Sequence, residues 1–192
     1  AGNRLFFAGL RHGVAAGIEH LVVLRGLGCE TVVDIGANRG QFSLAARECF
    51  PDAAIIAFEP LPAPAEIFVR VFSKDDLTKI HQVAIGPRSE NRKMHVSNSD
   101  DSSSLLPISA LQNEIFPGTS EAGTTDVQVA PLDMFVSEDE MGGSALLKLD
   151  VQGFELDALQ GCEGLLQQFR WIYCECSFVE LYFKPKIGCR YY

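Results

Sequence analysis

"TVVDIGANRGQFSLAAR", residues 31–47, is the stretch that decides the fold of this chain. Its β-branched start leads through Asp34 to Gly36, which is typical of a buried strand that ends in a turn. After Gly40, apolar residues recur at helical spacing, so we expect a helix over 40–50. A strand, a glycine loop and a helix in this order indicate a ligand site at the carboxyl end of a parallel sheet.

Similar apolar runs recur along the chain and predict further buried strands, with helices between them. We expect these strands at 53–60, 78–86, 127–130, 143–153 and 170–182, and the helices at 61–73 and 154–166. Strands that are apolar throughout are typical of a parallel sheet covered on both faces. The fold class is therefore α/β, a doubly wound, mostly parallel sheet flanked by helices. The tail 183–192 shows no helix or strand pair, so we expect the sheet to lack its last strands.

The length of 192 residues fits one domain over 1–192. Leu10, Val14, Ile18 and Leu21 lie at helical spacing and predict an amphipathic packing helix within an N-terminal helical segment, 1–30. Residues 87–126 are polar and rich in turn formers. They are too long for an ordinary connection, so we expect an insertion or lid there.

Composition narrows the function further. The formal net charge is −9, and a phosphate backbone needs clustered Lys and Arg, so nucleic acid is not expected as a partner. Charged residues interrupt the apolar N-terminal stretch, so we expect no membrane span. The six cysteines show no paired spacing, which favours reduced thiols and a cytoplasmic location. Oligomeric state is left open.

The loop after the first strand differs from a dinucleotide site. It reads GANRG rather than G-x-G-x-x-G, and Asp34 precedes it, where a carboxylate would repel a pyrophosphate. A ligand with an ammonium and a sulfonium group fits better, and S-adenosylmethionine is such a ligand. Glu59 follows the next strand, near the spacing of an acid that binds ribose hydroxyls.

Six separated motifs now point to a family. The chain contains VVDIGANRGQFS, AFEP, VAIG, SSSLL, PLDMF and LLKLDVQGFELDALQG, in this order. Together they resemble the FkbM-type S-adenosylmethionine-dependent methyltransferases, a class I group with a Rossmann-like fold, over about residues 20 to 183. The resemblance implies an O-methyltransferase that acts on a hydroxyl of a sugar, glycolipid or natural product, with a small-molecule or glycan- or lipid-linked acceptor.

The resemblance also implies where the methyl donor binds. The loop would hold its methionine end, Glu59 with Pro60 its ribose, and a third group its adenine. The predicted cofactor-binding residues are Asp34, Gly36, Ala37, Asn38, Gly40, Phe42 and Ser43 for the first part, then Glu59 and Pro60, then Val83, Ala84 and Ser103. Where the family commonly has K-I-D-V-E-G, this chain has Gln152 in place of the acid.

The candidate catalytic residues lie near the fourth main strand. Asp150 at its carboxyl end is the first candidate for a general base, with Lys148 beside it and His95 in the insertion as weaker candidates. Asp150 and Glu175 would be the ligands if a divalent cation took part, although no dense acidic cluster favours one.

Two other functions stay open. The chain could be a non-catalytic module that binds S-adenosylmethionine or S-adenosylhomocysteine. It could also be an NAD-dependent oxidoreductase, which Asp34 and the missing glycine disfavour.

Overall fold

The computed structural model describes residues 2–98, 102–175 and 182. Its centre is a five-stranded sheet in the order β3-β2-β1-β7-β8, with every neighbouring pair parallel. The strands are β1 (Thr31–Ile35), β2 (Ala54–Phe58), β3 (Thr78–His81), β7 (Ala145–Leu149) and β8 (Phe169–Cys174). Since β2 and β7 flank β1 on opposite sides, strand order reverses at β1. Ligands of such sheets bind at this switch point.

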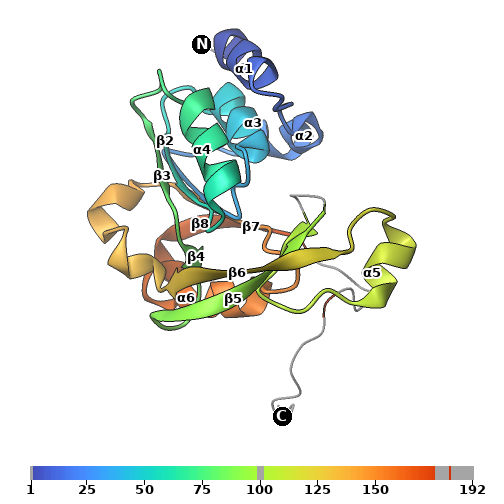
Figure 1. The fold of residues 1–192 in the computed structure, drawn as a ribbon. Coiled ribbons are helices and arrows are strands. Elements are labelled where there is room, and N and C mark those ends of the chain that lie inside the picture. The colour runs from blue at the N-terminus through green and yellow to red at the C-terminus, as the bar shows by residue number, and fades with distance from the viewer. Residues whose placement is uncertain (1, 99–101, 176–181, 183–192) are drawn as a thin grey trace.

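Both faces of the sheet are covered, as the apolar runs predict. The helices α3 (Gln41–Cys49) and α4 (Pro62–Val71) pack on one face (Figure 1). Val32 and Leu146 point into that layer, whereas Val33 and Leu147 point into the opposite one, which includes α6 (Glu155–Gly161) and a second sheet. The predicted α/β class and doubly wound parallel architecture are therefore confirmed.

The N-terminal segment is not the continuous amphipathic helix that its spacing predicts. It forms α1 (Gly2–Arg11), a 3₁₀ turn η1 (Ile18–His20) and the short α2 (Leu21–Leu24). Gly13, with a φ of 72°, turns the chain out of α1. Val14 is buried at 2% exposure outside any helix, while Leu10 and Ile18 are 63% and 64% exposed. Helical spacing was therefore a poor guide because the chain breaks between these residues.

The predicted third strand, 78–86, is split between two sheets. Its first half is β3, while its second half is β4 (Ala84–Ile85), which pairs with β6 (Glu121–Ala130). The predicted insertion, 87–126, contains β5 (Glu90–Ser97), α5 (Ala110–Ile115) and most of β6, and β5 pairs antiparallel with β6. The second sheet has the order β4-β6-β5 and crosses the molecule below the main sheet (Figure 1).

Short 3₁₀ turns complete the described chain. They are η3 (Leu132–Met134), η4 (Glu138–Met141) and η5 (Glu163–Gln168), and η5 replaces the last turns of the helix expected over 154–166. Among the residues that the structure describes, no helix has the length and apolarity needed to span a bilayer. The expectation for the tail 183–192 lies outside the described residues.

Candidate functional site

A pocket of about 240 Å³ opens at the carboxyl ends of β1, β2 and β7, at the switch point of the sheet. Residues from the loops after these strands, from the second sheet and from the N-terminal segment form its walls. The lining residues are Glu19, His20, Ile35, Gly36, Ala37, Asn38, Gln41, Phe42, Phe58, Glu59, Pro60, Leu61, Val83, Ala84, Ile85, Met94, Ser103, Leu105, Lys148, Asp150, Val151, Gln152 and Phe154.

The glycine loop after β1 uses its amides within the chain. The N–H groups of Gly36 and Ala37 both donate to the carbonyl of Phe58, and Gly40 N–H donates to Ala37. Asn38 N–H donates to Glu59 Oε2 at 3.0 Å. A loop that cradles phosphate would turn these amides toward the ligand, so this loop has a different use.

Both loop glycines are required by the fold. Gly36 has a φ of 75°, and a Cβ on it would lie 1.9 Å from the carbonyl oxygen of Asp150. Gly40 has a φ of 99° and packs against Phe72, which a Cβ would approach to 2.6 Å. The close approach that these glycines permit is therefore to other parts of the chain, and Gly40 does not line the pocket.

Glu59 ends β2 as a buried carboxylate on the pocket wall. Leu61 N–H donates to Oε1 at 2.8 Å and Asn38 N–H to Oε2 at 3.0 Å, so each oxygen keeps a lone pair for a further donor. Burial raises the pKa of Glu59 to about 7, although both N–H donors act in the opposite direction. The carboxylate is thus held rigidly and is able to accept two hydrogen bonds from a ligand.

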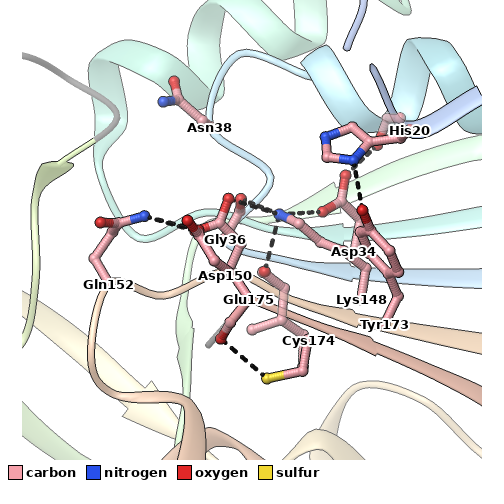
Figure 2. A network of polar contacts seen from close by, with 12 residues as sticks. His20, Asp34, Gly36, Asn38, Lys148, Asp150, Gln152, Tyr173, Cys174 and Glu175 are labelled. Atoms are coloured by element: carbon pink, nitrogen blue, oxygen red, sulfur yellow. Dashed lines mark hydrogen bonds and ion pairs between the residues drawn. The ribbon is translucent and has the colours of Figure 1, made fainter. Parts of the chain in front are cut away.

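Asp34 is buried beneath the pocket and does not line it. Its Oδ1 lies 3.0 Å from Lys148 Nζ, and Ser43 Oγ donates to its Oδ2 at 2.6 Å (Figure 2). The positive charge that pairs with Asp34 is thus the ammonium of Lys148 and not that of a ligand. Ser43 is likewise buried beside Asp34, away from the pocket wall.

Lys148 binds the loop as well as Asp34. Its Nζ donates to the carbonyl oxygens of Gly36 at 2.8 Å and Ile35 at 3.3 Å, and it lies 3.8 Å from Asp150 Oδ2 (Figure 2). Burial alone would lower the pKa of Lys148, but the carboxylates of Asp34 and Asp150 raise it. Lys148 is therefore a fixed ammonium that connects β7 to the glycine loop.

Asp150 follows β7 and lines the pocket, as the sequence predicts for its place in the fold. Gln152 Nε2 donates to Asp150 Oδ1 at 2.8 Å and to Glu175 Oε2 at 3.2 Å. Burial opposes ionisation of Asp150, but Lys148 and hydrogen bonds from Glu175 and Gln152 outweigh it and lower its pKa. The hydrogen bond with Asp150, followed by burial, raises the pKa of Glu175 to about 7. Of the two acids, Asp150 is therefore the one that ionises first, and Glu175 is the one that keeps its proton to higher pH.

Gln152 also connects this acid pair to more distant segments. Tyr182 Oη donates to its side-chain oxygen at 2.7 Å, and Ser104 Oγ donates to its carbonyl at 2.6 Å. All polar atoms of the Gln152 amide are thereby used. In the described part of the chain, no group of three or more His, Cys, Asp or Glu side chains gathers as metal ligands would.

The opposite part of the pocket is largely apolar. Val83 and Ala84 reach it because the chain leaves β3 and enters β4 at this point, and Met94, Ser103 and Leu105 come from the predicted insertion. Val83, Ala84 and Ser103, the residues predicted to enclose an adenine ring, therefore all line this pocket.

Two residues of the N-terminal segment line the pocket without having been predicted to. His20 lies edge-on to Phe42 and to Tyr173, with ring centroids 5.1 and 5.5 Å apart. Its Nδ1 is 3.0 Å from Tyr173 Oη (Figure 2). Glu19 precedes it on the pocket wall. A lone histidine in a loop has no motif to mark it, and only the tertiary packing shows its position.

Other histidines lie elsewhere. His95, a candidate base, sits in β5 with Nδ1 2.8 Å from Glu121 Oε2, and it does not line the pocket. His81 lies at the carboxyl end of β3, because the predicted strand 78–86 is split after it. There its ring stacks on Phe58.

The comparisons with known proteins agree on one family. The model of the methyltransferase FkbM domain matches residues 34–188. The 2-O-methyltransferase NoeI of Sinorhizobium fredii is 30% identical over 157 residues, which cover 79% of this chain and 65% of that protein. Methyltransferase 1 of Beauveria bassiana is 28% identical over 144 residues, 69% of this chain and 58% of that protein. O-methyltransferase hasC of Aspergillus fumigatus is 53% identical over 47 residues, 24% and 11% of the two chains.

The chain thus spans less than two thirds of the length of these relatives. The family model nevertheless matches most of the chain, and it covers the glycine loop, Glu59, Lys148 and Asp150 alike. The chain belongs to the FkbM methyltransferase domain family.

Proposed function

We propose that this chain is the catalytic domain of an S-adenosylmethionine-dependent O-methyltransferase that acts on a hydroxyl of a sugar, glycolipid or natural product. The proposal rests first on Glu59, whose two oxygens are fixed by backbone N–H groups and keep lone pairs toward the pocket. A pair of neighbouring hydroxyls, as on a ribose, is the donor group that matches two fixed carboxylate oxygens. O-methyl transfer is suggested by the names of NoeI and hasC.

The remaining walls fit the other parts of the methyl donor. Val83, Ala84, Met94 and Leu105 give the pocket an apolar lining that would suit a flat aromatic base. Asn38 Oδ1 and Gln41 Oε1 are buried acceptors without a hydrogen-bond partner in the described residues, and they lie in the glycine loop and at the first residue of α3, where the methionine ammonium would bind. When bound, S-adenosylmethionine supplies an electrophilic methyl group on a positively charged sulfur.

The geometry disfavours a dinucleotide ligand. The loop amides of Gly36, Ala37, Asn38 and Gly40 all donate within the chain, so they do not form a pyrophosphate cradle. Lys148, a lysine on the pocket wall, is bound to Asp34 and to two loop carbonyls. The oxidoreductase alternative therefore has little support in this site.

The residues at the end of β7 would orient the acceptor. Asp150 lines the pocket with one oxygen held by Gln152 and the other facing Lys148, so its carboxylate is placed to accept a hydrogen bond from an incoming hydroxyl. Because methyl transfer is an in-line displacement, such positioning is the main contribution that the protein makes. A divalent cation at Asp150 and Glu175 remains a prediction, which loss of activity on chelation and its return with Mg²⁺ would support.

The experiment that tests the proposal is a calorimetric titration of the protein with S-adenosylhomocysteine, with NAD as the parallel ligand. We expect micromolar binding of the first, in the usual range for a substrate-sized ligand, and no heat from the second. Binding of NAD alone would contradict the proposal. Binding of S-adenosylhomocysteine without methyl transfer to any hydroxyl in a broad acceptor panel would favour the non-catalytic module.

A further inference from the structure

His20 is part of the pocket although it lies outside the segment that the family model matches. Two contacts hold the N-terminal segment in this place. Gly17 N–H donates to the carbonyl of Gln41 at 2.9 Å, and the His20 ring packs edge-on against Phe42 and Tyr173. Gly17 itself has no room for a Cβ, which would lie 2.7 Å from the His20 ring. The imidazole is therefore positioned by its contacts with Gly17, Phe42 and Tyr173.

The other polar groups on this side of the pocket are already engaged. Lys148 Nζ has contacts with Asp34, Asp150 and two carbonyl oxygens for its three hydrogens. Asp150 faces Lys148 with one oxygen and accepts from Gln152 with the other. His20 Nδ1 is paired with Tyr173 Oη, whereas Nε2 lies 3.5 Å from Glu19 Oε1, on a largely exposed side chain. Imidazole is also the side chain whose protonation changes nearest to neutral pH.

We infer that His20 is a catalytic residue of the methyl transfer, with Nε2 as the atom that accepts the proton of the acceptor hydroxyl. This inference rests on the proposed function and adds to it a residue from outside the matched family segment. The step requires the tautomer in which Nδ1–H donates to Tyr173 Oη and Nε2 carries the lone pair. Tyr173 is a positioning residue that holds the Nδ1 edge of the imidazole, and its ring, stacked on Phe42 with centroids 5.8 Å apart, fixes where the hydroxyl lies.

In the proposed methyl transfer, one bond forms, one bond breaks and one proton is released. The acceptor oxygen forms a bond to the methyl carbon while the carbon–sulfur bond breaks, and the electron pair of that bond stays on the sulfur and neutralises its charge. The hydroxyl proton passes to His20 Nε2. The resulting imidazolium lies beside the Glu19 carboxylate, which stabilises it until the proton leaves to solvent. The products are a methyl ether, S-adenosylhomocysteine and one proton.

Several charged or titratable groups face this imidazole and shape its pH response. They are Glu19 on its own turn, Tyr173 on β8, and Asp150 and Lys148 at the end of β7. Asp150 and His20 are close enough to interact electrostatically.

The test uses sinefungin, an analogue in which an amine replaces the methylated sulfonium, and therefore does not need the acceptor. We would measure the affinities of sinefungin and S-adenosylhomocysteine by calorimetry for the wild type and for His20→Gln, with His12→Gln as the matched control at an exposed histidine. If Nε2 lies at the reacting methyl, His20→Gln weakens sinefungin roughly tenfold, the loss of one hydrogen bond to a charged group. S-adenosylhomocysteine affinity stays within about twofold, and His12→Gln changes neither.

A second measurement separates protonation from shape. Sinefungin binding to the wild type is expected to weaken relative to S-adenosylhomocysteine as the pH is lowered from about 8 to about 5, because a protonated imidazole would repel the amine. His20→Gln should abolish that relative change. The role of His20 would be overturned if His20→Gln bound each ligand as tightly as the wild type does. It would also be overturned if sinefungin binding to His20→Gln kept the pH response of the wild type. Failure of the wild type to bind S-adenosylhomocysteine at all would instead overturn the proposed function.

Discussion

Around Glu59 the polar groups of the pocket are fixed by backbone N–H donors, whereas around His20 they are fixed by other side chains. In the half of the pocket around Glu59, the donors are the backbone N–H groups of Leu61 and Asn38, and both residues follow strand ends of the main sheet. In the second half, His20 depends on Tyr173 and Phe42, and it comes from a segment that the family model does not match.

The two halves of the pocket therefore differ in how strongly a side-chain substitution changes their geometry. Backbone donors keep their positions when side chains change, so the half around Glu59 suits a ligand that stays the same. Side-chain contacts change with single substitutions, so the half around His20 is more easily altered by mutation. Lys148 lies where the halves meet, because it binds the glycine loop on one side and faces Asp150 on the other.

The largest effect is expected at this junction. Lys148→Met would leave Asp34 buried without its cation, and breaking a buried ion pair in this way costs about 3–5 kcal/mol of the free energy of unfolding. Urea unfolding would measure the loss. Lys79→Met is the matched control, because its pair with Glu140 is exposed and contributes about 0–1 kcal/mol. Equal losses in the two variants would contradict the role given to Lys148, and adding Asp34→Asn to Lys148→Met should recover part of the stability.

Glu59→Gln tests the half that is fixed by the backbone. The amide keeps the size of the side chain but has only one oxygen, so it cannot accept from Leu61, Asn38 and two ligand hydroxyls. We expect S-adenosylhomocysteine to bind about 10- to 100-fold more weakly, the loss of a hydrogen bond to a charged group. Glu66→Gln on the exposed face of α4 is the control and should leave the calorimetric affinity unchanged.

The pH dependence of binding follows from the same group. With the pKa of Glu59 raised to about 7 in the ligand-free protein, about a tenth of the molecules have an ionised Glu59 at pH 6 and most do at pH 8. Affinity for S-adenosylhomocysteine should therefore rise by up to about tenfold over this interval. A flat profile in the wild type, or an equal rise in Glu59→Gln, would argue against Glu59 as the ligand-binding acid.

The stability of the free protein should change in the opposite direction. A carboxyl whose pKa is raised from 4.5 to about 7 binds its proton more tightly in the folded state than in the unfolded one. Its contribution to stability is therefore present below pH 4.5 and is lost as the pH rises through 7. The difference in urea midpoint between wild type and Glu59→Gln, measured across this window, isolates the contribution.

The smallest effect is expected from Tyr173→Phe, which tests the half that is fixed by side chains. The variant keeps the ring contacts with Phe42 and His20 but removes the hydroxyl that pairs with His20 Nδ1. We expect a loss of about 0.5–1.5 kcal/mol in unfolding free energy, the net value of one hydrogen bond. Binding of S-adenosylhomocysteine should not change, and a clear loss of that affinity would show that the two halves are not separate.

The main sheet was predictable because its strands are apolar on both faces, and the position of Glu59 follows from its place after β2. Three features were not predictable for physical reasons. The run 78–86 contains no glycine or proline before Gly86, so no local turn former shows that the chain leaves the main sheet after His81. The ammonium near Asp34 comes from β7, which only cross-strand pairing reveals. His20 reaches the pocket through a turn after Gly13, where helical spacing no longer applies.

The pairing of Asp34 with Lys148 has a consequence for how the sheet assembles. These two residues are directly opposite each other in the parallel register of β1 and β7. A slip by one residue would place Asp34 beside Leu147 or Leu149 and turn Lys148 to the other face, which leaves two buried charges without partners. Strands as uniformly apolar as VVDI and ALLKL have little else to distinguish one alignment from the next. The ion pair therefore specifies the alignment of the two central strands, and with it the geometry of every loop that follows them.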